Sequence, residues 1–417
     1  MKKFLSRLTT ILLVATLVLG CMTGCNSSEK DTSKGDTANS SNSSNTKNVK
    51  IGLICLHDEN STYDLNFINS IETVKKNLGL SDDQVIIKKN IPESNECREA
   101  AYDLADRGCN IILADSFGHE PYILEAAAKY PDVQFCHSTG TLAHTEKKSN
   151  FHDAFASIYE GRYLAGIAAG MKLNEMIDNG KITADQAVIG YIGAYTYAEV
   201  ISGYTSFFLG ARSVCPSATM KVQFTGSWYD ETAEKEAANK LISDGCVLIS
   251  QHADSMGAPT ACENAGVPNI SYNGSTQDAC PNTFIVSSRI DWAPYYEYVI
   301  KSVMEGKEMA YDYVGSLADG SVKLTAVNTN AAAAGTQEAI DKAIEDLKAG
   351  KIHVFDTNNF TVGGSKLDSY LADVDTDDNY TPDTEVIKDG YFHESEYRSA
   401  PYFDLRIDGI TTLNEMY

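Results

Sequence analysis

Short apolar runs alternate with amphipathic stretches along most of the chain, beginning near Val49. Ile51–Leu56 is a continuous apolar run, which is typical of a strand buried on both faces. Apolar residues then recur at helical spacing between Leu65 and Leu78. The alternation repeats and predicts further strands at Val85–Ile87, Ile111–Ala114 and Val133–His137, and then at Ala187–Ile192, Met220–Phe224, Val247–Gln251 and Asn269–Tyr272. Two such series predict an α/β chain with two doubly wound parallel-sheet lobes.

A long helix near Glu160–Asn179 separates the two series, and extra segments follow the second one. These segments are predicted as strands at Phe284–Ser287 and Val322–Val327, and as helices at Trp292–Glu305 and Thr336–Lys348. A chain needs such additional material if it crosses back between lobes. We therefore assign residues 49–157 and 286–316 to the first lobe, and residues 158–285 and 317–417 to the second. The last sixty or so residues are predicted to form an irregular wrap with short strands.

The first 25 residues have the pattern of a lipoprotein signal peptide. A basic start precedes the apolar run Leu8–Leu19, which is too short to cross a bilayer core of about 30 Å. Small residues ending in a cysteine follow twice, and we favour Cys25 over the alternative Cys21 because polar residues follow Cys25 at once. Residues 26–48 contain 15 serine, threonine or asparagine residues out of 23, which predicts a flexible tether. The sequence thus predicts a lipid-anchored body on the outer face of a bacterial cell membrane.

The charge balance narrows the range of partners. With 34 lysine and arginine residues against 57 acidic ones, the net charge of −23 repels a phosphate backbone and excludes a nucleic-acid partner. Ligands of open α/β sheets bind beyond the carboxyl ends of strands. The segments at those positions are His57–Asp64, Asp115–His119, Gly193–Tyr197, Gly226–Asp230, Gln251–Ser255, Tyr272–Ser275 and Ser288–Trp292. They are rich in aromatic, amide, acidic and hydroxyl side chains and nearly free of lysine and arginine, which favours a flat, neutral, hydrogen-bonding ligand.

Several of these segments, in order and spacing, resemble one known family. They are Ile51–Ile54 with the loop Asp58–Asp64, then Ala114–Gly118, Tyr159–Gly166, Gly226–Asp230, Gln251–Ser255 and Ser288–Tyr296. Over roughly Val49–Gly350 the chain is similar to the basic membrane protein (Bmp) family of ABC-transporter substrate-binding lipoproteins. The resemblance implies a type I periplasmic-binding fold, with two lobes joined by a three-crossover hinge and a ligand in the cleft between them. It also implies a membrane permease driven by a cytoplasmic ATPase as partner.

The resemblance further implies a purine ligand, because members of the family bind mostly purine nucleosides and, in one branch, free nucleobases. Its nucleoside binders carry an Asp-x-Ser-Phe-Asn motif in the first loop and a lysine after the serine pair of a crossover strand. Here the first loop, Glu59–Asp64, departs from that motif, and Arg289 follows the serine pair. These departures favour an adenine-like nucleobase, with nucleosides as the second choice.

Ten residues are expected to bind the ligand by stacking or hydrogen bonding. They are Tyr63, Asp64, Ser116, Phe117, Trp228, His252, Asp254, Tyr272, Asn273 and Trp292. The two tryptophans are expected to face each other across the cleft, against the alternative that each packs within its own lobe. Asp64 and Asp254 have an alternative role as helix N-caps. Arg162 is interpreted as structural.

No metal or cofactor is expected. His252 and Asp254 lack a third ligand at a suitable spacing. The chain also has no dinucleotide, P-loop, nucleophile-elbow or zinc-protease motif. A solute-binding protein is therefore favoured over a ligand sensor, and both over a purine-processing enzyme. The eight cysteines from Cys55 onward are interpreted as mostly free core thiols, with a disulfide such as Cys262–Cys280 left as an alternative.

Overall fold

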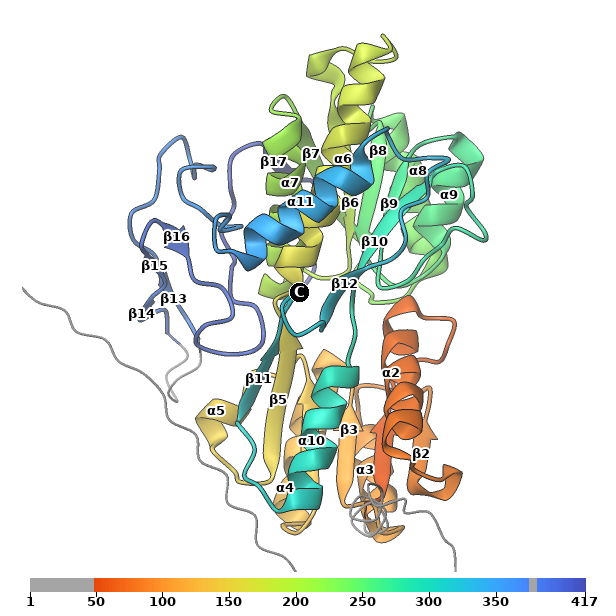
Figure 1. Ribbon diagram of the computed structural model, residues 1–417, viewed down its shortest axis with the longest axis vertical. Helices are drawn as coiled ribbons and strands as arrows, with labels where there is room; N and C mark the ends of the chain where they lie inside the picture. Colours follow the sequence, from red (N-terminus) through yellow and green to blue (C-terminus); the bar gives the residue numbers. More distant parts are fainter. Residues whose placement is uncertain (1–48, 375–380) are drawn as a thin grey trace, which may run out of the picture. The chain divides into compact units, whose positions relative to one another are not determined.

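The computed structural model describes residues 49–374 and 381–417 of the 417-residue chain. The predicted signal peptide, the tether and both candidate lipidation sites, Cys21 and Cys25, lie outside the described residues. The described chain contains two large sheets, each with helices on both faces (Figure 1).

The first sheet has six parallel strands in the order β11-β5-β4-β3-β1-β2. Its strands are β1 (Ile51–Ile54), β2 (Val85–Lys88), β3 (Ile111–Ala114), β4 (Gln134–Ser138), β5 (Phe151–Ala156) and β11 (Asp312–Gly315). Its principal helices are α2 (Thr62–Leu78), α3 (Asn95–Asp106), α4 (Glu120–Lys129) and α10 (Ala293–Glu305). Helix α2 packs beside α10, and α3 packs beside α4.

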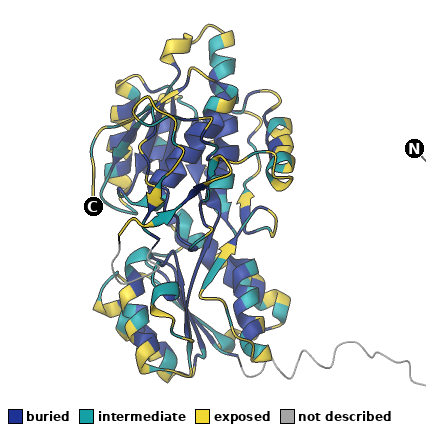
Figure 2. Ribbon diagram, turned by 90° about the vertical axis from the view of Figure 1, so that its left-hand side faces the viewer, coloured by how far each residue is buried: buried dark blue, intermediate teal, exposed yellow. Residues whose placement is uncertain are grey.

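Burial on both faces explains why the central strands β1 and β3 of the first sheet are continuous apolar runs. In β3, Ile111 and Leu113 belong to the core cluster that includes Phe67 of α2. The alternate residues Ile112 and Ala114 belong to the cluster formed by α3 and α4. Because successive side chains of a strand point to opposite faces, every position of such a strand has to be apolar. Figure 2 shows the resulting buried strands in dark blue, between helices that are exposed on their outer sides.

The second sheet has seven strands in the order β12-β10-β9-β8-β6-β7-β17, all parallel except β12, which runs antiparallel to β10. Its strands are β6 (Val188–Gly193), β7 (Thr219–Phe224), β8 (Leu248–His252), β9 (Asn269–Tyr272), β10 (Phe284–Ile290), β12 (Val322–Leu324) and β17 (Ile410–Thr412). Its helices are α6 (Ile158–Asp178), α7 (Ala198–Val214), α8 (Glu231–Ser243), α9 (Gly257–Ala265) and α11 (Thr336–Lys348). Helix α6 packs against both α7 and α11.

Two strands of the first sheet were not among the sequence predictions. Strand β5 carries the buried polar residues His152 and Asp153, which interrupt its apolar pattern. Strand β11 is only four residues long, lies at the sheet edge and is half exposed. Neither strand has an uninterrupted apolar run like those of β1 and β3, and only pairing with β4 and with each other defines them.

The chain passes between the sheets three times, and one crossing differs from the predicted boundary. The passages follow β5, β10 and β11. The boundary predicted at residue 286 falls inside β10, whose residues pair with β9 and β12 of the second sheet. The crossing therefore lies at about Asp291, because the serine pair of β10 completes the second sheet before the chain leaves it.

The C-terminal part forms the expected irregular wrap around the second sheet. Its short strands are β13 (Leu371–Ala372), β14 (Thr384–Glu385), β15 (Ile387–Lys388) and β16 (Tyr391–Phe392). Phe355 and Phe403 stack with ring centroids 4.2 Å apart and fasten the wrap to the core. Strand β17 then extends the second sheet beside β7. Beyond it, the Met416 backbone pairs with Thr196, which follows β6.

The structure also shows the state of the cysteines and the length of the apolar helices. All eight cysteines between Cys55 and Cys280 are buried free thiols, Cys262 and Cys280 included. Within residues 49–374 and 381–417, no helix is both long and apolar enough to cross a bilayer.

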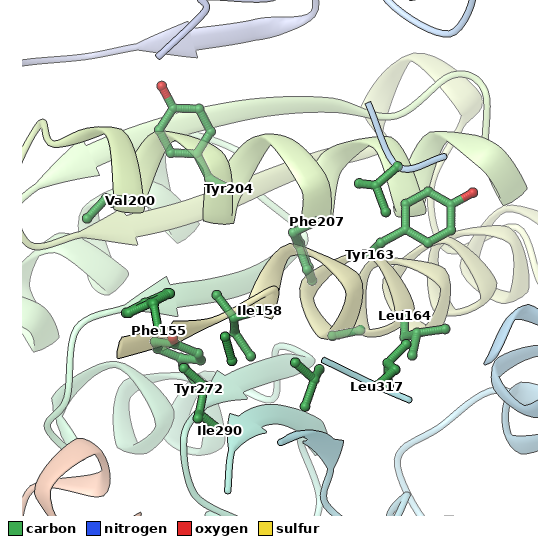
Figure 3. Packing of buried hydrophobic residues seen from close by; sticks show 14 of the residues in the cluster. Phe155, Ile158, Tyr163, Leu164, Val200, Tyr204, Phe207, Tyr272, Ile290 and Leu317 are labelled. Carbon is green, nitrogen blue, oxygen red and sulfur yellow. The ribbon is translucent and has the colours of Figure 1, made fainter. Parts of the chain in front are cut away.

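Helix α6 lies unusually close to α7. A Cβ atom at Gly166 would lie 2.0 Å from the Phe207 carbonyl oxygen, and one at Gly210 would lie 2.0 Å from the Tyr163 carbonyl oxygen. The two backbones thus touch at these glycines, and large side chains fill the space around the contact. Figure 3 shows Tyr163 and Leu164 of α6 beside Phe207 of α7.

Gly166→Ala is expected to destabilise the protein by at least about 2 kcal/mol, because the added methyl meets backbone atoms that cannot move without separating the helices. Urea unfolding measures the loss. Gly161→Ala on the same helix is the matched control and should cost less, since the atoms nearest to its Cβ belong to side chains, those of Val322 and Ser288 at 2.9 and 3.2 Å, and not to a facing backbone. Equal losses for the two variants would contradict the backbone contact.

Candidate ligand-binding site

A cavity with about 370 Å³ of empty space, its mouth included, lies where the carboxyl ends of the strands of both sheets meet. The first sheet and its helices contribute Leu56, His57, Tyr63, Asp64, Ser116, Phe117 and Thr139 to its lining. The second sheet and its helices contribute Glu199, Trp228, His252, Asp254 and Tyr272. None of these lining residues is a lysine or an arginine.

The structure brings eight of the ten sequence-predicted residues together in this lining. The eight are Tyr63, Asp64, Ser116, Phe117, Trp228, His252, Asp254 and Tyr272. Asn273 lies directly behind them, because its Nδ2 donates to Asp254 Oδ1 at 3.2 Å. Trp292 does not line the cavity.

The expectation that the two tryptophans face each other is corrected. Trp292 is 2% exposed and stacks on Phe67 of α2, with ring centroids 4.5 Å apart. It directly precedes α10, so its ring fills the space between that helix and α2 in the core of the first lobe. Trp228 lines the cavity and meets Tyr195 edge-on at 5.2 Å.

Four lining residues were not among the ten: Leu56, His57, Thr139 and Glu199. Thr139 follows β4, so the rule that ligands bind at strand exits applied to the next strand would have found it. Its φ of 75° is rare for a residue with a branched side chain and marks backbone strain. Glu199 is the second residue of α7, two positions beyond the strand-exit segment Gly193–Tyr197.

Two carboxyl groups on the first-sheet side carry different charges. Burial opposes ionisation of Asp64, but hydrogen bonds from His57 and Ser61 lower its pKa overall. Burial and the charge of Asp64 raise the pKa of Asp115 well above its usual range. Asp115 Oδ1 accepts a hydrogen bond from Leu56 N at 3.0 Å and holds the end of β1 in place. Asp64 is therefore the ionised acceptor at the cavity, and Asp115 is a neutral acid behind it.

The second-sheet side combines two acids of raised pKa with an imidazole of lowered pKa. Burial raises the pKa of Glu199 to about 7, and its Oε1 lies 3.3 Å from His252 Nε2. Burial and the nearby Arg162 charge lower the pKa of His252 well below its usual range. Burial and the neighbouring acids raise the pKa of Asp254. Groups of this kind can donate as well as accept hydrogen bonds without carrying charge.

Arg162 lies behind this wall, outside the cavity lining. Its guanidinium carbon is 3.4 Å from the centroid of the Tyr272 ring, and Nη1 donates to the Gln251 carbonyl oxygen at 3.0 Å. It therefore supports the ring of a lining residue from behind, which agrees with the structural role expected for it.

Contacts between the two sides narrow the cavity. Thr62 N donates to the Asp254 carbonyl oxygen at 3.2 Å, across from one sheet to the other. The rings of Phe117 and Tyr197 also meet across the sides, with centroids 5.3 Å apart. The result is a nearly closed slot with aromatic walls and acidic hydrogen-bonding groups, which fits a flat, uncharged ring system better than an anion.

Two parallel-sheet lobes, three crossings and a cavity between the strand ends define the type I periplasmic-binding fold. Solved structures of that kind align with the chain. A solute-binding protein of an ABC transporter from Conexibacter woesei covers 73% of this chain and 98% of its own, at 21% identity and a TM-score of 0.59. One from Aeropyrum pernix covers 74% and 93%, at 15% identity and a TM-score of 0.61.

A family model described as PnrA-like ABC transporter substrate-binding proteins, Bmp, matches residues 55–354, and this chain belongs to that family. A purine-binding protein of Brucella abortus is 29% identical over 306 residues, covering 69% of this chain and 81% of that protein. A provisionally named ABC transporter glucose-binding protein of Haloferax volcanii is 32% identical over 257 residues, covering 60% of this chain and 62% of that protein. Members of the family bind a solute outside the cytoplasm for an ABC transporter.

Asp115→Asn is expected to flatten the dependence of stability on pH. In the folded protein the raised pKa of Asp115 keeps a proton that the unfolded chain releases, so this group lowers stability as pH rises from about 4. The amide stays neutral and still accepts from Leu56 N, so the variant gains stability relative to the wild type as pH rises above about 4. Urea unfolding at several pH values measures this difference.

Asp115→Ala provides the comparison. It leaves the Leu56 N–H without its acceptor and should cost about 1–3 kcal/mol at every pH. A constant difference between wild type and Asp115→Asn at all pH values would mean that Asp115 is ionised in the folded protein.

Proposed function

We propose that this protein captures a purine nucleobase, adenine-like, or a purine nucleoside in the cavity between its lobes. It then delivers the ligand to an ABC permease from a lipid-anchored position on the outer face of the membrane. The observation that carries the proposal is the lining of the cavity. Aromatic rings from both sheets enclose a space that has acidic hydrogen-bonding groups and no lysine or arginine.

The arrangement of rings favours a flat ligand. Tyr63 and Phe117 belong to the first-sheet side, and Trp228 and Tyr272 belong to the second. A purine between them stacks on one ring and loses water on both faces when the lobes close. Asp64, Asp254 and Glu199 then supply acceptors and donors at the rim of the ring.

Binding of a ribose has less support than binding of a free purine base. Arg289, at the position where nucleoside binders of the family carry a lysine, lies outside the cavity lining, and its Nη2 is 3.8 Å from Asp291 Oδ2. Arg289 therefore pairs with Asp291 and is not part of the surface that would contact a ribose. A free base is therefore the first choice, and the purine-binding Brucella relative supports the same class.

A sensor is the second candidate, since the same lobe closure can be read by a receptor. Metabotropic glutamate receptor-like protein J of Dictyostelium discoideum is 28% identical to this chain over 212 residues, which is 26% of that protein. Genes for a permease and an ATPase beside this one would favour transport over sensing.

Calorimetric titration with adenine, adenosine, AMP and glucose tests the ligand class. Adenine or adenosine is expected to bind, and AMP at least about a hundredfold more weakly, a gap of about 2.7 kcal/mol, because no cation in the lining offsets a phosphate. Trp228→Ala should weaken purine binding about thirtyfold or more. Tight glucose binding with no heat from purines would replace this proposal with a sugar ligand.

The two tryptophans supply an internal control for the same experiment. Indole fluorescence is expected to change on purine addition in the wild type and in Trp292→Phe, since Trp292 lies in the core. Trp228→Phe should lose most of the change. If Trp228→Ala lowers thermal stability and leaves purine affinity untouched, Trp228 is a packing residue only.

Metabolic labelling with a fatty-acid analogue tests the anchor. The full chain is expected to take up the label, and Cys25→Ala should lose it, because the Gly24-Cys25 junction precedes the polar tether. Loss in Cys21→Ala in place of Cys25→Ala would move the site and keep the anchor. Label retained in both variants would exclude these two cysteines as the attachment site, and a wild-type chain that takes up no label would exclude the lipid anchor.

A further inference from the structure

Three buried side chains of the first lobe form a cluster outside the cavity lining. Glu120 is the first residue of α4, and His137 and Asp153 are paired residues on the neighbouring strands β4 and β5. One donor atom from each lies within 4.8 Å of the others. Their exposed fractions are 4%, 0% and 0%, so bulk water does not solvate them. None of the functions argued above uses this cluster.

His137 has a fixed tautomer with one bare nitrogen. Its Nε2 lies 2.7 Å from the Ser116 carbonyl oxygen, which only accepts hydrogen bonds, so Nε2 carries the proton. Nδ1 therefore has a free lone pair, and it is buried without any hydrogen-bond partner. Metal-bound histidines are usually oriented in this way, with the second ring nitrogen donating to a carbonyl or a carboxylate.

Asp153 directs a second unsatisfied atom at the same place. Its Oδ2 accepts from Ala143 N at 2.8 Å, whereas Oδ1 is buried, accepts from no N–H group and lies 3.9 Å from His137 Nδ1. That separation is too long for a hydrogen bond. It exceeds by about 0.5 Å the roughly 3.4 Å between two ligands about 2.0–2.1 Å from a tetrahedral ion, so binding an ion draws the two atoms together. The Asp153 carboxyl group also interacts with the carboxyl group of Glu120.

Glu120 brings a second buried carboxylate to the cluster. Its Oε1 accepts from the backbone of Thr141 and Leu142, at 2.7 and 2.8 Å, which fixes its direction. Among the residues that the structure describes, no lysine or arginine pairs with Glu120 or Asp153. Two adjacent buried carboxyl groups require either a shared proton or a bound cation.

The backbone beside the cluster is shaped to leave room for it. A Cβ atom at Gly140 would lie 2.2 Å from Asp153 Oδ1 and 2.6 Å from Glu120 Oε1. Any side chain at this position would push the two carboxyl groups away, so only glycine allows both to converge here.

We propose that Glu120, His137 and Asp153 bind one divalent transition-metal cation of the zinc and manganese class. One imidazole nitrogen with two carboxylate oxygens suits that class of ion. The ion satisfies the two orphaned atoms and neutralises the carboxylate pair. It also braces the cavity wall, because His137 holds the Ser116 carbonyl group and Thr139 follows two residues later.

Elemental analysis and thermal unfolding of the untagged full chain test the proposal. After dialysis against Zn²⁺ or Mn²⁺ and removal of free ion, about one ion per chain is expected. EDTA should lower Tm by at least about 3 °C, because an ion that binds only the folded state stabilises it. A wild-type chain that retains no ion and shows the same Tm in EDTA, Zn²⁺ and Mn²⁺ overturns the proposal in favour of a shared proton.

Variants of the cluster sharpen the test. Asp153→Asn and Glu120→Gln keep the side-chain size and should weaken ion binding at least about tenfold. Asp115→Asn is the matched control, because Asp115 belongs to a separate buried acidic cluster with Cys55 and Asp64, and it should retain the ion. An ion retained by Asp153→Asn and lost by Asp115→Asn would also overturn the assignment. Should a cluster variant fail to fold, the wild-type comparison with EDTA decides alone.

Discussion

The backbone contact between α6 and α7 is the constraint on which the second half of the site depends. Helix α6 starts directly after β5 of the first sheet and packs along the second, so it joins the two halves. Its approach to α7 is limited by backbone contacts at Gly166, Gly170 and Gly210. Arg162 of α6 lies behind the ring of Tyr272, and Glu199, near the start of α7, lines the cavity. Separating the helices would displace both.

The electrostatics of the site follow from burying acids without basic partners. Asp115, Asp254 and Glu199 all have raised pKa values because burial penalises their charged forms. The cavity thus combines acids that ionise less readily than usual with the ionised Asp64. Together with the strongly acidic chain, this lining disfavours anions, which supports the uncharged ligand proposed above. At Glu120 and Asp153, the proposed bound cation neutralises two further buried acids.

Local pattern was sufficient for most of the fold. Strands such as Ile51–Ile54 and Ile111–Ala114 are buried on both faces, so their apolar runs identify them directly. Strand β5 was missed, because buried polar residues are favourable there only through partners on other elements. The cavity residues predicted from the sequence came from strand exits, since parallel strands deliver their carboxyl ends to one edge.

The sequence by itself determined the two α/β series, the acidic character and the segments that meet at the strand ends. These depend on hydrophobic periodicity and on the sign of charges, which are local properties of the chain. Only the tertiary structure decided between similar residues at similar positions. Trp228 and Trp292 both follow strands. Trp292 stacks on Phe67 in the core of the first lobe, whereas Trp228 lines the cavity. His137 and Asp153 are sixteen residues apart and become partners only because β4 and β5 pair in that register. Such choices depend on contacts between distant parts of the chain, which no local pattern contains.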